Sequence, residues 1–224
     1  MLINMVIGFS GVFIATQTYQ TNKIQTEVAR NSVLPDFVIN EEVLYDEETE
    51  KSTDMVIEIS NLEGRLNNYH SNIVTVLQCQ YVDEEANEYQ AELPVENYYI
   101  VGNRSGKSTG SIEKRRTAGN YLKWQKLETD IRNYTQNSGI SSLSAVLKSY
   151  VKISYTNLLG EKEEIYYQVD SFQTELMDKE NGQNKFENYN LLCESNLGIN
   201  FNEAKEVQVV DLINTICGTA EKNM

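Results

Sequence analysis

The first sixteen residues of the chain form an uncharged and mostly apolar run that gives way abruptly to polar sequence. No charged side chain occurs between Leu2 and Thr16, and bulky apolar residues fill nine of these fifteen positions. The small or polar residues recur at spacings of four, three and four, which places them on one narrow face of a helix at about 100° per residue. These residues are Asn4, Gly8, Gly11 and Ala15, and Thr18 continues the series.

A helix with one seam of small residues and bulky flanks suits association inside a lipid bilayer, where close backbone packing replaces the hydrophobic drive. We therefore expect a transmembrane helix over residues 1–19 that pairs through this seam. The run is short, about 27 Å against a hydrocarbon core of about 30 Å. The alternatives are a helix buried in a soluble core, a helix lying on a membrane surface, and a signal peptide, which normally begins with basic residues.

The positions of charged residues and of Pro35 predict the orientation of this helix and the segments that follow it. Lys23 and Arg30 follow the apolar run and no basic side chain precedes it. The positive-inside rule then favours a single-pass protein with its C-terminal part in the cytoplasm. Residues 20–35 form a predicted polar helical stalk that Pro35 ends. The remaining residues, 36–224, are sufficient for one domain with its own core.

Beyond Pro35 the hydrophobic pattern changes to the alternation that is typical of β-strands. Residues 71–82 alternate clearly. Residues 146–155 and 164–169 also alternate and flank a turn-forming segment, which predicts a hairpin. Shorter apolar runs predict further strands at residues 36–45, 55–60 and 97–101.

Two segments keep a helical period, residues 120–135 and residues 203–217. The second lies between Asn202, a favourable N-cap, and Gly218, a favourable C-terminal stop. The predicted buried stripes are Trp124, Leu127, Ile131 and Tyr134 in the first helix, and Val209, Val210, Ile213, Ile216 and Cys217 in the second.

Residues 177–190 are rich in Asn, Glu and Lys and are predicted to be a loop. Taken together, the patterns predict the α+β class: an N-terminal transmembrane helix followed by a mainly antiparallel β domain with packed helices.

Composition narrows the classes of function. The net charge of −14 argues against nonspecific binding to nucleic acid, which requires a broad positive field. The three cysteines are scattered without a C-x-x-C pair, as expected in a reducing compartment. With His70 as the single histidine, a histidine-rich metal site is excluded, and we assign no catalytic residue, metal ligand or cofactor.

The charge is unevenly distributed, with one basic segment between Arg104 and Lys126. This segment holds seven of the nineteen basic residues and one acid, a local charge of +6 that leaves −20 for the rest of the chain. Its first half is rich in Gly, Ser and Thr, whose amides and hydroxyls can join the cations around phosphates. The predicted ligand-binding residues are Arg104, Lys107, Lys114, Arg115, Arg116, Lys123 and Lys126. The alternative is a solvated, flexible loop.

Two further motifs are near misses. The stretch from Gly102 to Ser108 resembles a Walker A loop but has three residues between its glycines where the motif requires four. The acidic clusters at residues 41–42, 46–48 and 83–85 lack the residue order of a calcium-binding EF-hand loop, so we interpret them as solvated turns.

The layout of an N-terminal apolar helix, MLINMVIGFSGVFIAT, a polar stalk and a domain with the basic segment RSGKSTGSIEKRR resembles small membrane effector subunits of bacterial anti-phage systems, of the Hailong type. Membership would imply a homo-oligomeric ion channel, for instance a tetramer, that acts in antiviral defence in the bacterial inner membrane. Its gating ligand would be a nucleotide or short oligonucleotide made by a partner enzyme.

We therefore expect a non-enzymatic membrane effector that conducts ions or disrupts the membrane under control of such a ligand. The alternative is a non-catalytic, membrane-tethered binding or scaffold module, and lipid headgroups are a second candidate for the anionic ligand.

Overall fold

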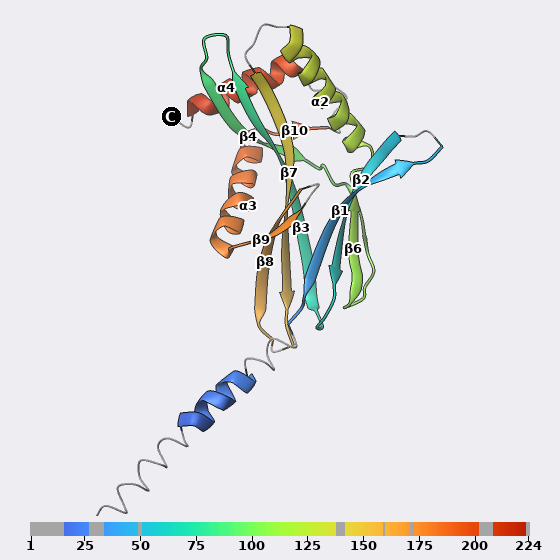
Figure 1. Ribbon diagram of the computed structural model, residues 1–224, viewed down its shortest axis with the longest axis vertical. Coiled ribbons are helices and arrows are strands. Elements are labelled where there is room, and N and C mark those ends of the chain that lie inside the picture. Colours follow the sequence, from blue (N-terminus) through green and yellow to red (C-terminus); the bar gives the residue numbers. More distant parts are fainter. Residues whose placement is uncertain are drawn as a thin grey trace, which may run out of the picture.

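The computed structural model describes residues 16–26, 34–48, 51–137, 142–158, 160–170, 173–201 and 208–222. Two β-sheets and several helices make up the described domain (Figure 1). The first sheet has the order β1 (Phe37–Asp46), β2 (Lys51–Asn61), β6 (Gly110–Arg116) and β5 (Val101–Arg104). The second has the order β10 (Ile199–Asn200), β4 (Glu88–Glu96), β3 (Asn67–Val82), β7 (Ser142–Thr156), β8 (Lys162–Val169) and β9 (Thr174–Met177).

Neighbouring strands are antiparallel throughout, except that the short β10 runs parallel to β4. Three helices belong to the domain: α2 (Asn120–Asn137), α3 (Lys179–Glu194) and α4 (Val209–Lys222). A further helix covers residues 16–26.

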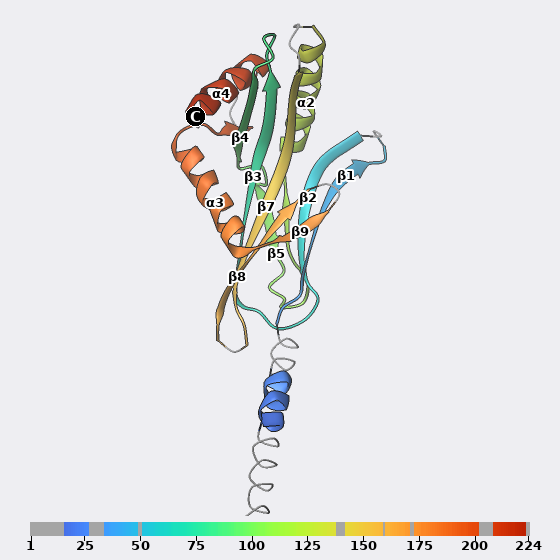
Figure 2. The same cartoon turned by 60° about the vertical axis from the view of Figure 1, so that its left-hand side comes forward.

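The long strands β3 and β7 bury both of their faces because each face meets a different layer. Along β3, Leu77 and Cys79 point into the main core, which also contains residues of the first sheet and of α2 and α4. On the opposite face, Val74 and Val76 pack with Phe186 of α3 in a separate cluster. Figure 2 shows α3 and α2 on opposite sides of this sheet.

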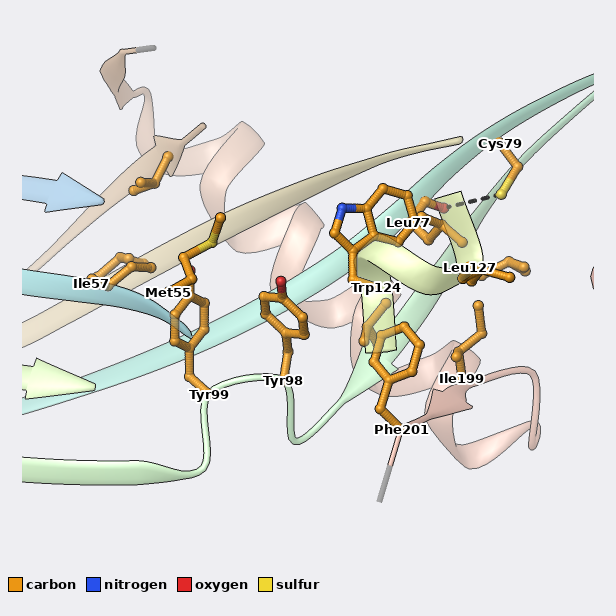
Figure 3. Close-up of a cluster of buried hydrophobic side chains, with 14 of the residues drawn as sticks. Met55, Ile57, Leu77, Cys79, Tyr98, Tyr99, Trp124, Leu127, Ile199 and Phe201 are labelled. Atoms are coloured by element: carbon orange, nitrogen blue, oxygen red, sulfur yellow. Dashed lines mark hydrogen bonds between the residues drawn. The ribbon is translucent and has the colours of Figure 1, made fainter. Parts of the chain in front are cut away.

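The main core joins the inner face of the second sheet to the first sheet and to α2 and α4. Figure 3 shows Trp124 of α2 beside Leu77 and Leu127, with Phe201 and Ile199 below them. Tyr98 is 2% exposed, and its hydroxyl finds no hydrogen-bond partner within the described part of the chain.

Several predicted elements are confirmed. Strands β7 and β8 pair as the predicted hairpin, with Val151 opposite Tyr167 and Ile153 opposite Ile165. The predicted helix 120–135 is α2, whose buried residues include Trp124, Leu127 and Ile131. The predicted strands at 55–60 and 71–82 lie within β2 and β3, and the one at 36–45 matches β1 to within one residue.

Other predicted elements are wrong. The predicted loop 177–190 is mostly α3, whose polar sequence forms a helix because Phe186 docks on Tyr150 and Tyr166 of the second sheet. The predicted strand 97–101 is a turn that carries the buried Tyr98 and Tyr99, and only Val101 enters β5. Of the stripe predicted for helix 203–217, Val209 and Ile216 are buried in α4, but Val210 is exposed and Leu212, outside the predicted stripe, is buried. The predicted N-cap Asn202 and residues 203–207 lie outside the described residues.

The predicted fold class is also wrong. The described chain is mostly β structure in two sheets, and none of the described helices is long and apolar enough to cross a membrane. The described N-terminal residues, 16–26, form a helix of exposed side chains that include Gln, Thr, Asn and Lys.

This finding overturns the predictions of a transmembrane helix, a membrane protein, an ion channel and a location in the bacterial inner membrane. The seam residues Asn4, Gly8, Gly11 and Ala15 lie outside the described residues, and Thr18 is an exposed residue of the helix 16–26.

Candidate functional site

The structure distributes the predicted ligand-binding residues over two strands, a hairpin loop and a helix. Arg104 ends β5, Lys107 lies in the loop that follows, and β6 carries Lys114, Arg115 and Arg116. We call these five residues the basic edge because β5 is the outermost strand of the first sheet.

The other two predicted residues lie on α2, outside the basic edge. Lys123 donates a hydrogen bond from Nζ to the backbone carbonyl of Phe201, and Lys126 lies about one turn further along the helix. Five of the seven predicted ligand-binding residues therefore belong to the basic edge, and two do not.

Residues 102–108 form β5 and the loop of an antiparallel hairpin. In this hairpin Arg104 pairs with Glu113, and the N–H of Ser105 donates to the carbonyl of Ile112. A Walker A loop connects a strand to a helix, so the near-miss motif has no phosphate-loop geometry here.

The side chain of Glu113 is the centre of the basic edge. It lies between the two sheets and is 2% exposed. Its Oε2 accepts hydrogen bonds from the hydroxyls of Ser71 (2.6 Å) and Tyr69 (2.9 Å), both on β3. Its Oε1 accepts from Nε of Arg115 (2.7 Å), and Nε of Arg104 lies 3.4 Å from Oε2. One buried carboxylate thus fixes two guanidinium groups.

The hydrogen bonds around Glu113 keep it ionised. Burial alone would raise the pKa of this carboxyl, but hydrogen bonds from Ser71 and Arg115, together with the charge of Arg115, lower the pKa overall. The Arg115 guanidinium also donates to the backbone carbonyl and the hydroxyl of Ser71, so it is held from two sides. Arg104 and Arg115 therefore occupy defined positions before any ligand binds.

The opposite face of β6 carries two separate ion pairs. Nζ of Lys114 lies 2.9 Å from Oε2 of Glu58 on β2, and Nη2 of Arg116 lies 3.0 Å from Oδ2 of Asp54. Asp54 is buried and also accepts hydrogen bonds from the Thr117 hydroxyl and from the N–H of Met55. Burial opposes ionisation of Asp54, yet these hydrogen bonds and the charge of Arg116 lower its pKa.

Lys114 and Arg116 are about half exposed, but each is paired with an acid of its own. Arg104 instead shares Glu113 with Arg115. Arg104 is 43% exposed; its guanidinium lies over the Tyr69 ring, 5.4 Å from the centroid, and its Nη2 is 3.4 Å from Nδ1 of His70. Lys107 is exposed, and its ammonium group forms no ion pair with any residue that the structure describes. The five basic residues and the three acids that they contact, Asp54, Glu58 and Glu113, leave a surplus of two positive charges.

Apart from the basic edge, a concave surface lies on the outer face of the second sheet, beside the C-terminal half of α3. It is an open groove of about 660 Å³ lined mainly by polar side chains, among them Gln78, Gln90, Ser144 and Lys148. The sequence signal for it was the change along the outer face of β3 from Val74 and Val76 to the glutamines that follow. Within the described residues, no group of three His, Cys, Asp or Glu side chains could hold a metal ion.

Comparisons with known proteins leave the family open. No protein-family model and no curated protein matches the chain. Among solved structures, that of a Bordetella pertussis protein assigned as ApaA is similar at 9% sequence identity and a TM-score of 0.18, over 64% of this chain and 93% of that chain. A TM-score of this size supports no conclusion about fold or function. The resemblance to Hailong-type effectors stays a prediction that these comparisons do not test.

Proposed function

We propose that this protein is a non-catalytic binding module that recognises an anionic ligand at the basic edge. The observation that carries the proposal is the surplus of two positive charges at β5 and β6, in a chain whose net charge is −14. Lys114 and Arg116 are each matched by an acid, whereas Arg104 and Arg115 share one, and Lys107 has none among the described residues.

The geometry supports recognition because the cations are fixed before binding. Glu113 holds Arg104 and Arg115, and ordering them in advance lowers the entropy cost of binding. A guanidinium group presents several N–H donors in one plane, and this arrangement matches the oxygens of both carboxylates and phosphates. Lys107 adds an exposed positive charge at the adjoining loop.

The test is to neutralise, in the full chain, the two exposed cations that lack an acid of their own. The variant Arg104→Gln/Lys107→Gln should bind fluorescein-labelled octaglutamate, or a labelled oligodeoxynucleotide of matched charge, about 2- to 30-fold more weakly in fluorescence anisotropy at low salt, since each exposed ion pair contributes about 0.2–1 kcal/mol.

The matched control is Lys148→Gln/Lys179→Gln, which removes the same charge from the outer face of the second sheet and the start of α3. Equal affinity of both double variants for both probes, or no binding of either probe by the wild-type chain, would refute an anion site at the basic edge.

A further inference from the structure

The strand β5 leaves one edge of the first sheet open. Its residues, Val101 to Arg104, are all exposed, and β6 is its one neighbour in the described sheet. An unpaired strand edge presents a row of N–H and C=O groups that can pair with another extended chain.

The hydrogen-bond alternation shows which groups of β5 face outward. The N–H of Ser105 donates to the carbonyl of Ile112 at 2.9 Å, which marks a hydrogen-bonded pair of the β5–β6 ladder. Such pairs alternate in antiparallel sheets, so Asn103 bonds to β6, whereas Gly102 and Arg104 direct their N–H and C=O groups away from it. The bond from Thr117 to Met55 on the other side of β6 fits the same alternation.

Two other sheet edges, those of β4 and β1, are protected in ways that β5 is not. The outer edge of β4 carries Pro94 and is partly covered by β10. On β1, the carbonyl of Ile39 accepts a hydrogen bond from the Thr174 hydroxyl at 2.8 Å. In contrast, β5 contains a glycine and no proline, and the exposed Ile100 and Val101 (46% and 52%) lie at its start.

The chemistry of the edge specifies what would pair with it. Arg104 and Gly102 share the face that points toward the second sheet, since they lie opposite Glu113 and Arg115, while Val101 lies on the other face. An incoming antiparallel strand would therefore place one side chain beside the cation of Arg104 and, three residues later, one beside the apolar Val101. Opposite charges and apolar pairs directly across two strands are stabilising.

We infer that β5 is a docking edge for an extended acidic peptide segment of a partner protein, which adds to the first sheet as a fifth strand. Its backbone bonds to Gly102 and Arg104, a carboxylate faces Arg104, a second carboxylate reaches Lys107, and an apolar side chain covers Val101. This inference rests on the proposed anion-binding function and adds the class of ligand.

A peptide probe tests the backbone pairing without altering the protein. The probe is the labelled, capped peptide Asp-Glu-Thr-Thr-Val-Thr, in which Glu is placed opposite Arg104 and Val opposite Val101. N-methylation of the two probe residues opposite Gly102 and Arg104 removes their donors, and should weaken binding about tenfold or more. N-methylation opposite Val101 and Asn103, where the probe's N–H groups point to solvent, should leave the affinity within about twofold.

A protein variant tests the same bonds from the other side. Gly102→Pro removes the outward N–H of residue 102 and spares the bonds to β6, so it should weaken probe binding about threefold or more. Gly102→Ala keeps the N–H, and its Cβ meets Arg115 at an ordinary contact distance of 3.6 Å. It serves as the matched control, and thermal unfolding of both variants checks that β5 remains folded.

The outcomes separate this inference from the proposed function. If neither N-methylation nor Gly102→Pro matters while Arg104→Gln/Lys107→Gln still weakens binding, strand addition is refuted and anion binding stands. Binding of the oligodeoxynucleotide without binding of the peptide refutes strand addition in the same way. If neither probe binds the full chain, both proposals fail.

Discussion

Replacing Glu113 by Gln should destabilise the domain, because this carboxylate joins the two sheets. It accepts hydrogen bonds from Tyr69 and Ser71 of one sheet and from Arg115 of the other. Gln has nearly the same shape but no charge, so Arg104 and Arg115 would lose their shared partner. The amide group would also present a donor where both Ser71 and Tyr69 now donate.

The magnitude follows from burial. Removing one partner of a fully buried ion pair costs about 3–5 kcal/mol. The side chains of Arg104 and Arg115 keep 43% and 25% of their surface exposed, so water solvates part of the released charge. We therefore expect a loss of about 2–3 kcal/mol in the free energy of unfolding, a decrease in Tm of about 4–12 °C for a domain of this size.

The pH dependence makes the test specific. A carboxyl whose folded pKa is lowered stabilises the fold above its unfolded pKa of about 4.3 and loses this effect as the pH falls through the folded pKa. The difference between wild type and Glu113→Gln should thus be complete at pH 7 and shrink below about pH 4 in denaturant unfolding. The control Glu88→Gln, at an exposed position of β4, should change stability by less than about 0.5 kcal/mol. A Glu113→Gln variant as stable as this control at pH 7 would refute the reasoning.

Two further predictions concern other buried contacts. Burial raises the pKa of Glu41, although a hydrogen bond from Tyr99 opposes this, so stability should fall as the pH rises through that pKa. Glu41→Gln should then be at least as stable as wild type at pH 7, with the gain absent at pH 3; a variant less stable at pH 7 would contradict this. Gly182 of α3 lies against the Tyr166 ring, where a Cβ would clash. Gly182→Ala should therefore lower the free energy of unfolding by about 1–3 kcal/mol, and unchanged urea unfolding would show that α3 docks differently.

Sequence periodicity predicted the elements whose stability comes from one apolar face. The alternation of residues 146–155 and 164–169 predicted the β7–β8 hairpin, and the stripe from Trp124 to Ile131 predicted α2. The hydrophobic pattern did not predict β6, because Glu113 and Arg115 occupy inward positions that are normally apolar. Their mutual ion pair compensates for burial, and this compensation depends on Ser71 and Tyr69, more than forty residues earlier in the chain.

The same distinction holds for the candidate site. The residues alone establish that an acidic chain concentrates positive charge between Arg104 and Lys126, because local composition needs no fold. Which of these charges are compensated depends on the folded domain, since Asp54 and Glu58 on β2 neutralise Arg116 and Lys114. Folding also places residues 101–104 at an open strand edge, of which only Val101 was predicted to be in a strand. Strand pairing joins residues far apart in the chain, so no local pattern of hydrophobic and polar positions records which edge stays unpaired.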